Sequence, residues 1–454
     1  MKKILLSAVV LMSAVSIQAI ETPTEPPVVE HVATFGGGEI SGQIKAMHII
    51  TDKDNNWTPN SGSGYLGTLK YETQEIVKGL KAGAAFYING DTGLTDWGEY
   101  PVNSATDGTK PAQGMFTSVG GEENSHLGQA YLEYNSGKDI HAKIGRMILN
   151  TPLTKIQWSL MPNFYEAGVV STQAVPNFSL TLAHITKMSY GSRSATDWSL
   201  IGEKTGTAGV ARPVVGQGPG TLEQAKFIDI GTALNPNINT NGITALNATY
   251  KGIRNLTASI WDYYAHDIAN MIYADVNYKI PVMKNAPLAL SAQYLSQGET
   301  GDKLGGDLDY TMYGVKAKIG NKKYAAYIAY NQSTDDGKFL NAWGADPVYT
   351  SSMFSRNAYR QDVGAYKIGG HYTIVKGLKL KAGYANYGQS KTLGGTAGAV
   401  AANEDATELD IMLIYKPTKA WTFKIFNAIR TSEYNSDTKE YEMNHVRLVA
   451  WYDF

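Results

Sequence analysis

The stretch LKLKAGYANY at residues 378–387 indicates the fold class of this chain. Apolar and polar side chains alternate along it, residue by residue. One side carries Leu378, Leu380, Ala382 and Tyr384, and the other carries Lys379, Lys381 and Tyr387. Successive side chains of a β-strand point to opposite faces, whereas a helix would not gather these residues into one apolar face. We therefore predict a strand with one apolar and one polar face.

The same alternation recurs from Gly38 to the end of the chain, in segments of about ten residues. We predict eighteen strands, at 39–50, 64–73, 78–89, 126–135, 139–146, 164–172, 177–187, 242–250, 256–264, 270–279, 286–295, 308–318, 322–332, 362–373, 377–388, 406–416, 420–431 and 442–454. The segment 225–235 is also strand-like. We assign it to a long loop, because bacterial single-chain barrels have an even number of strands.

The predicted connections alternate in length along the chain. Short ones lie at 74–77, 136–138, 173–176, 251–255, 280–285, 319–321, 374–376 and 417–419, and long ones at 90–125, 147–163, 188–241, 333–361 and 389–405. An antiparallel meander has this property when one edge of the sheet carries short turns and the other edge carries long loops. In a soluble sandwich, short and long connections would be mixed.

Aromatic side chains end most of the descending strands on their apolar side. They are Tyr71, Tyr134, Tyr250, Tyr278, Tyr372, Tyr415 and Phe454. Near the tops of the ascending strands, Phe86, Tyr294, Tyr330 and Tyr384 suggest a second ring. The core of a soluble sandwich or solenoid would scatter its aromatic residues in depth, whereas the two interfaces of a membrane select such girdles.

Lysines lie in the middle of strands on the polar side, at Lys45, Lys81, Lys143, Lys316, Lys381 and Lys424. A lysine that faced lipid near the bilayer midplane would cost about 2–4 kcal/mol. A dry protein core is no better, because an unpaired buried charge is strongly unfavourable. We therefore predict an all-β fold: a transmembrane antiparallel β-barrel of about 18 strands around an aqueous lumen, with short periplasmic turns and long extracellular loops.

Residues 1–19 have the pattern of a secretory signal peptide, with Lys2 and Lys3, then an apolar run, and a small residue at Ala19. The run is shorter than the roughly 20 residues that a membrane helix needs. We expect residues 20–37 to form a Pro-rich periplasmic lead-in. Residues 38–454 would form a single barrel domain of an exported envelope protein.

The composition argues against several classes of function. The chain has no Cys, which excludes a disulfide framework and a Cys-ligated metal. Its 40 Lys and Arg residues balance 41 Asp and Glu residues, which argues against nucleic acid as a partner. It contains neither HExxH nor GxSxG, and GQGPGT at 216–221 lacks the GxGxxG spacing. We therefore predict no enzymatic activity, no cofactor and no metal.

Several stretches resemble the substrate-selective OprD-type outer-membrane porins. They are GEISGQIKAMHI from Gly38, HLGQAYLEY (126–134), IHAKIGRMILNTPL (140–153), MPNFYEAGVV (161–170) and WGADPVYTSSMFSRNAYRQDVGAYKIGGHY (343–372). In the first of these, Lys45 stands where the family leads us to expect Arg. The resemblance implies a passive channel for small water-soluble solutes in the outer membrane of a Gram-negative bacterium. It also implies that the third loop narrows the pore and that a ladder of basic side chains guides carboxylates.

The predicted site residues form three groups. The inward cations that would make a basic stripe are Lys45, Lys316, Lys318, Lys367, Lys379, Lys381, Lys424, Arg430 and Arg447. The apolar loop near 147–163 would fold inward as a constriction, with Arg146, Lys155, Trp158 and Glu166 beside it. Asp346, Tyr349, Arg356 and Arg360 would face the entrance. The alternatives are that the lysines only solvate the lumen and pair with Glu408 and Asp410, that the apolar loop packs outside, and that the entrance charges are solvated.

We predict an outer-membrane porin that favours carboxylate-bearing nutrients such as amino or organic acids. A general diffusion porin and a structural or adhesin barrel are the alternatives. The expected partners are membrane lipid, lipopolysaccharide, small solutes and the outer-membrane assembly machinery, since the terminal Phe454 resembles the signal that this machinery reads. Trimers are common among porins, so a homotrimer is a further candidate state.

Overall fold

The computed structural model describes residues 33–53, 60–92, 124–155, 160–191, 226–235, 237–283, 285–337, 339–344, 346–390, 405–434 and 437–454. The predicted signal peptide, most of the predicted lead-in and Trp158 lie outside these ranges. Within them, the chain forms one antiparallel sheet of twenty strands and one 3-10 turn, Asn357–Tyr359. No helix in the described part of the chain is long and apolar enough to cross a membrane.

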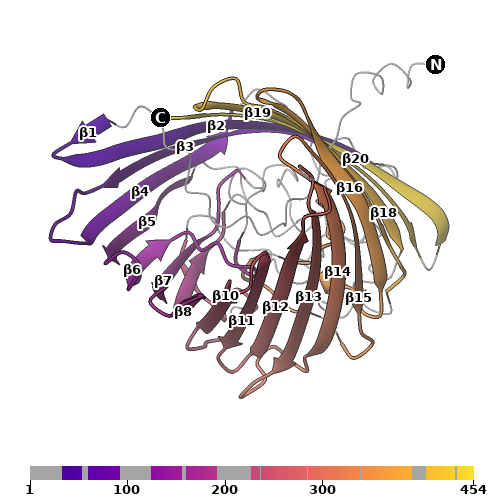
Figure 1. Ribbon diagram of the computed structural model, residues 1–454, viewed down its shortest axis with the longest axis horizontal. Coiled ribbons are helices and arrows are strands. Elements are labelled where there is room, and N and C mark those ends of the chain that lie inside the picture. Colours follow the sequence, from indigo (N-terminus) through magenta and orange to yellow (C-terminus); the bar gives the residue numbers. More distant parts are fainter. Residues whose placement is uncertain are drawn as a thin grey trace.

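Eighteen of the strands close into a barrel, which Figure 1 shows as a ring. In chain order they are β2 (Gly38–Lys53), β3 (Asn60–Glu72), β4 (Leu80–Asp91), β5 (Asn124–Asn135), β6 (His141–Met147), β7 (Phe164–Thr172), β8 (Phe178–Ser189), β10 (Ile243–Tyr250), β11 (Leu256–Ala265), β12 (Ala269–Ile280), β13 (Leu288–Glu299), β14 (Asp309–Gly320), β15 (Tyr324–Ser333), β16 (Gly364–Val375), β17 (Leu378–Tyr387), β18 (Ala406–Tyr415), β19 (Trp421–Tyr434) and β20 (Asp437–Asp453). Consecutive barrel strands pair antiparallel, and β20 pairs with β2 to close the ring. The predicted eighteen-strand antiparallel barrel is confirmed.

Two short strands are added to this ring. β1 (Ala33–Phe35) pairs with the start of β2, and β9 (Ile228–Asp229) pairs with the end of β8. After β9 the chain turns, and Ile230 and Ala233 are fully buried. The strand-like segment 225–235 is therefore not a barrel strand, because its apolar residues pack into the interior instead of alternating along the wall.

Closure of the ring brings the C-terminus against the first barrel strand. The backbone N–H of Gly42 donates to the carbonyl oxygen of Phe454 at 2.7 Å, and the backbone N–H of Phe454 donates back to Gly42 at 3.0 Å. A Cβ at Gly42 would lie 2.4 Å from the Phe454 ring, so this close approach requires glycine. Because the sheet is closed, its strands offer no long unpaired edge to another chain.

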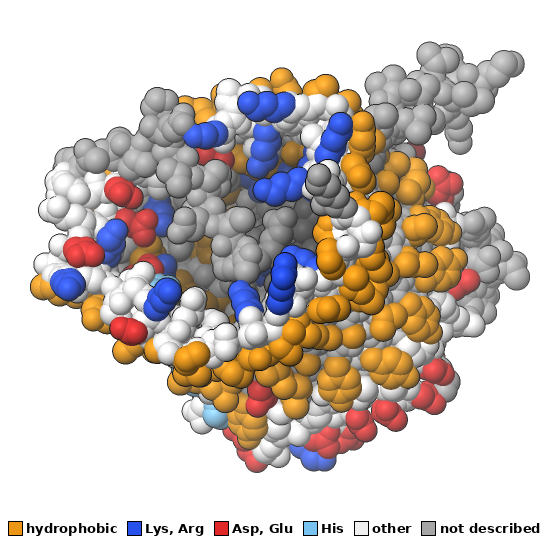
Figure 2. Space-filling model, in the orientation of Figure 1, with side chains coloured by type: hydrophobic (Ala, Val, Ile, Leu, Met, Phe, Trp, Pro, Cys, Tyr) orange, Lys and Arg blue, Asp and Glu red, His pale blue; other side chains and the backbone are white. Residues whose placement is uncertain are grey.

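The outer face of the barrel is apolar, as the orange surface in Figure 2 shows. Ile144 is 64% exposed and Val315 is 57% exposed, although both lie in the middle of strands. Members of both predicted aromatic girdles, among them Tyr134, Tyr372 and Tyr330, are exposed on this face. An apolar surface of this extent is stable in lipid and not in water.

The two ends of the barrel differ in their connections, as predicted. The end that holds the C-terminus carries short turns, such as 136–140 between β5 and β6 and 376–377 between β16 and β17. The opposite end carries the long connections. Two of these are largely described, 148–163 between β6 and β7 and 334–363 between β15 and β16. They are called loop 3 and loop 7 below.

Candidate functional site

Loop 3 packs against the inner wall of the barrel. Near its start, Leu153 is buried in the largest interior cluster, together with Tyr263 of β11. Near its end, Leu160 and Met161 are buried against Met47 and Ile49 of β2. These two β2 residues alternate with the lipid-facing Ile44 and Ile50 and share the parity of Lys45. The apolar side chains of loop 3 are thus buried against the inner wall of the barrel. The loop occupies part of the lumen and reduces its cross-section.

Loop 7 also lies inside the barrel, and it contacts loop 3 directly. The Asn341 side chain donates to the backbone oxygen of Leu153 in loop 3 at 3.1 Å. Loop 7 also contacts the segment after β8, where the Tyr190 hydroxyl donates to the backbone oxygen of Ala342 at 2.8 Å. The Tyr165 hydroxyl lies 2.8 Å from the carbonyl oxygen of Thr154 and 2.5 Å from that of Trp343, so it bridges the two loops.

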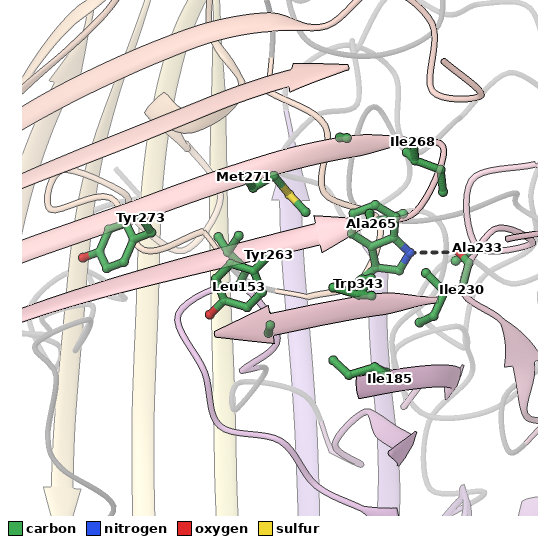
Figure 3. Packing of buried hydrophobic residues seen from close by; sticks show 14 of the residues in the cluster. Leu153, Ile185, Ile230, Ala233, Tyr263, Ala265, Ile268, Met271, Tyr273 and Trp343 are labelled. Carbon is green, nitrogen blue, oxygen red and sulfur yellow. Dashed lines mark hydrogen bonds between the residues drawn. The ribbon is translucent and has the colours of Figure 1, made fainter. Parts of the chain in front are cut away.

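Trp343 is the largest buried side chain at this junction, with 2% of its surface exposed. Its ring nitrogen donates to the backbone oxygen of Ile230 at 2.9 Å, the dashed line in Figure 3. The ring packs among Leu153, Ala265 and Ile268 in the same interior cluster. Three segments far apart in sequence, around 153, 230 and 343, therefore meet at one residue.

Amide side chains of the inner wall pair with the backbone of loop 7. Gln297 of β13 exchanges two hydrogen bonds of 2.7 Å with Leu340. Gln293 accepts from the backbone N–H of Tyr349 at 2.8 Å, and Asn331 of β15 accepts from that of Thr350 at 3.1 Å. Buried backbone groups need such partners, and side chains supply them here because the described residues of loop 7 form no strand.

The predicted basic stripe lies on the lumen side of the wall, and its members differ in burial. Five of them, Lys45, Lys316, Lys318, Lys379 and Lys424, are half-buried, and four, Lys367, Lys381, Arg430 and Arg447, are buried. Lys45 donates to the backbone oxygen of Leu160 in loop 3 at 3.2 Å. The stripe is therefore divided between side chains that line the lumen and side chains that the loops cover.

Aromatic rings, not acids, accompany two of the half-buried lysines. The Lys316 ammonium lies 4.7 Å from the centroid of the Tyr327 ring, and the Lys424 ammonium lies 4.5 Å from that of Trp451. In the described ranges, neither of these lysines nor Lys379 lies within ion-pair distance of a carboxylate. The alternative pairing with Asp410 is found for Lys367, at 3.4 Å.

Arg146 and Glu166, two of the residues predicted beside the constriction, lie on β6 and β7, the two strands that loop 3 connects. Arg146 and Glu166 form an ion pair of 3.0 Å, which Lys187 joins at 3.5 Å. The strand register puts Arg146 opposite Glu166. The Arg146 guanidinium lies 4.2 Å from the centroid of the Phe227 ring, which packs against the cluster that holds Leu160 and Met161 of loop 3. Lys155 lies on loop 3, where its backbone N–H donates to Thr151 at 3.1 Å.

The four residues predicted at the entrance are buried. Arg356 lies 3.9 Å from Asp346 within loop 7, and the Arg360 guanidinium lies 5.5 Å from the centroid of the Tyr387 ring. Burial raises the pKa of the Asp346 carboxyl above its usual value, while Arg356 and hydrogen bonds from Ser351 and Val348 oppose the shift. These charged side chains are buried within the packed loop. The alternative that the entrance charges are solvated does not hold for the described structure.

The wall across β3–β6 carries charges of both signs. Lys70 pairs with Glu72 at 2.8 Å, and Glu133 pairs with Lys143 at 3.2 Å. The Tyr131 hydroxyl donates to Glu72 at 2.6 Å. Figure 2 shows red and blue side chains together on the left, over these strands, and blue side chains elsewhere around the hollow. The lumen thus has a balanced wall and a basic wall.

Sequence reasoning missed the residues that hold the loops in place. Tyr165, Tyr190 and Trp343 join the loops, and Gln293, Gln297, Asn331 and Glu408 bind the backbone of loop 7. One signal was present in the sequence, since Gln and Asn on the lumen parity next to a long loop are suited to bind its backbone.

Comparisons with known proteins agree with this architecture. The family model described as "outer membrane porin, OprD family" matches residues 137–454. No curated protein matches the chain. The fold is similar to that of Pseudomonas aeruginosa OccK9 (OpdG), with a TM-score of 0.70 and 14% identity over 92% of this chain and 98% of that one. It is also similar to Pseudomonas aeruginosa OpdK solved with vanillate, with a TM-score of 0.67 and 14% identity over 91% of this chain and 98% of that one.

Proposed function

The chain belongs to the OprD family of outer membrane porins, and from this premise we propose that its lumen favours small carboxylate-bearing solutes, such as amino or organic acids, over neutral solutes of the same size. As a member of this family it is an outer-membrane channel and not an enzyme. It contacts membrane lipid and small solutes. Lipopolysaccharide, the assembly machinery and a second and third copy of the chain are further proposed partners.

One observation carries the proposal: Lys316, Lys379 and Lys424 face the lumen half-buried and without a carboxylate at ion-pair distance in the described ranges. Cations of one sign along a low-dielectric wall focus the field and raise the local concentration of anions. The wall across β3–β6 does not cancel this effect locally, because its own charges are paired with each other. An anion is thus attracted to one side of the lumen.

Loops 3 and 7 add the size limit that a selective channel needs. Both lie within the barrel and contact each other at Asn341 and Leu153. An eighteen-strand barrel without such loops would leave a wide aqueous channel. OpdK, which shares this fold, has been solved with vanillate, and we propose a carboxylate for the present chain as well.

Planar-bilayer recordings in a salt gradient test the charge preference. The wild type should show a reversal potential on the anion-selective side, and Lys379→Gln combined with Lys424→Gln should move it towards zero. The matched control, Lys138→Gln with Lys251→Gln, removes two charges from exposed turns and should leave it unchanged. A wild type without anion preference would contradict the proposal.

A liposome-swelling assay tests the solute class. Organic acids and amino acids should enter faster than uncharged sugars of equal size. Equal rates for all solutes of one size would identify a general diffusion porin instead.

A further inference from the structure

Side chains of four adjacent wall strands converge on the middle of loop 7, residues 350–355. β16 contributes Lys367, β17 contributes Tyr387, β18 contributes Glu408 and Asp410, and β19 contributes Arg430. All five are at most 6% exposed. They were attributed to the lumen by their parity, but loop 7 covers them.

The Lys367 ammonium group contacts buried acceptors of loop 7 and β18. It donates to the backbone oxygen of Ser351 at 2.9 Å and to the Ser352 hydroxyl at 2.7 Å, and it lies 3.4 Å from Asp410. An ammonium has three N–H donors, and these buried groups act as acceptors for them. A fully buried lysine without such partners would be strongly destabilising.

The wall strand between Lys367 and Asp410 makes room for this contact. In register, Ala385 of β17 lies opposite both Lys367 and Glu408, and Gly383 lies opposite Asp410. Larger side chains at these two positions would separate Lys367 from the acids of β18. The sequence KAGYANY at 381–387 therefore supplies small residues where the loop and the two charges meet.

Glu408 binds the loop backbone with both carboxylate oxygens. It accepts from the backbone N–H of Phe354 at 2.8 Å and from that of Ser355 at 2.6 Å. Arg430 donates to the Ser355 hydroxyl at 3.0 Å. The Phe354 side chain is fully buried among Phe426, Ala428 and Met443, so the loop is fixed by apolar packing as well.

The four charges of this cluster balance. Lys367 and Arg430 carry formal positive charges, and Glu408 and Asp410 carry formal negative charges, all on buried side chains. Arg356 and Asp346 of loop 7, which lie 3.9 Å apart, add one formal charge of each sign. A balanced group that is shielded from the lumen contributes little net field to a passing solute. Its geometry serves the loop, since each of Lys367, Glu408 and Arg430 contacts residues 351–355 directly.

We propose that Lys367 and Glu408 are positioning residues that hold loop 7 against β16–β19 and so fix the width of the pathway, and that they do not take part in attracting anions. This inference deepens the proposed function, and its prediction about ion selectivity rests on that function. It assigns different roles to five members of the basic stripe, with Lys316, Lys379 and Lys424 lining the path and Lys367 and Arg430 supporting the loop.

Single-channel recordings of matched lysine variants separate the two roles. Lys367→Met should raise the frequency of transitions between conductance levels several-fold, because the loop loses a support, and should shift the reversal potential much less than Lys379→Met does, because Lys367 is shielded from the lumen. Lys379→Met, the same substitution on a half-buried lumen lysine, should shift the reversal potential and leave the transition frequency as in the wild type. Glu408→Gln should behave as Lys367→Met does.

Two outcomes would overturn the proposal. One is an unchanged transition frequency in Lys367→Met, and the other is a shift of its reversal potential as large as that of Lys379→Met. If Lys367→Met does not assemble, Ser352→Ala removes one acceptor of Lys367 and keeps all four charges. It should show the same rise in transitions to a smaller degree. A wild type without anion preference would defeat the proposed function, yet the effect of these variants on transitions would still stand.

Discussion

Lys367 and Lys379 look alike in the sequence and differ in the structure. Both are lumen-facing lysines between apolar neighbours. Lys367 is fully buried under loop 7, whereas Lys379 is half-buried on the open wall. Alternation predicts the direction of each side chain because direction depends on strand geometry alone. Burial could not be predicted in this way, because the covering residues come from a loop whose path depends on the whole barrel.

Also at the scale of the residue, we expect that a single methyl group added at Gly42 lowers the stability of the barrel. Gly42→Ala places a Cβ 2.4 Å from both the Phe454 ring and the backbone oxygen of Thr68. Overpacking of this kind costs about 1–3 kcal/mol. When samples are heated and then separated on a gel, Gly42→Ala should convert from its folded to its unfolded form at a lower temperature than the wild type. Gly168→Ala is the control, since a Cβ there meets no atom within 4 Å, and equal melting of both variants would refute the closure argument.

At the scale of the element, each barrel strand separates lipid from the aqueous lumen, because its successive side chains point to opposite faces. On β14, Val315 is 57% exposed on the outer face, and its neighbour Lys316 faces the lumen. The sequence predicted which strand side chains face lipid and which face the lumen. Both the strand period and the preference of apolar residues for lipid produce the same alternation. It also indicated where turns are short, since these connections leave no room for other structure.

A lysine on the lipid-facing side of β14 should lower the stability of the barrel. Val315→Lys places an ammonium in lipid, which destabilises a barrel by about 2–4 kcal/mol near the midplane. Thr68→Lys adds the same side chain to the lumen face of β3 and should have little effect. Urea unfolding followed by tryptophan fluorescence compares the two. Equal midpoints for both variants would contradict the assignment of the faces.

Loops 3 and 7 were predicted less completely than the strands. The apolar residues of loop 3 suggested burial, and Leu153, Leu160 and Met161 are buried. Asp346 and Arg356 in loop 7 looked as suited to solvent as to the pore, because a sequence does not show which charges pair inside a fold. Their pairing depends on the wall that the loop meets.

Trp343 is expected to be the residue on which the junction of the two loops depends. Trp343→Ala removes a buried indole, and truncations of this kind cost about 3–5 kcal/mol. Purified protein carrying this change should lose protection of loop 7 against added protease and should conduct more current per channel. Trp421→Ala, which truncates a 41% exposed indole on the outer face, should leave loop 7 protected. Wild-type protection in Trp343→Ala would show that the loops hold without it.

At the scale of the whole molecule, the lumen is electrically asymmetric. Paired charges line β3–β6, whereas Lys316 on β14, Lys379 on β17 and Lys424 on β19 have no carboxylate at ion-pair distance in the described ranges. The alternation predicted both the eighteen strands and the basic side. Residues such as Glu133, which neutralise the opposite wall, were not singled out, because their partners, His141 at 2.6 Å among them, lie on a neighbouring strand.

The junction of the two loops also has a consequence for biogenesis. Asn341 and Leu153 are separated by 188 positions, and the closing pair β2 and β20 joins the two ends of the chain. Contacts of such long range form late, because the entropy of closing the intervening chain must be overcome first. A barrel that closes before its loops meet would be, for that interval, a wide hole in the permeability barrier. The order of these two events would then determine how leaky the cell surface is while new copies are inserted.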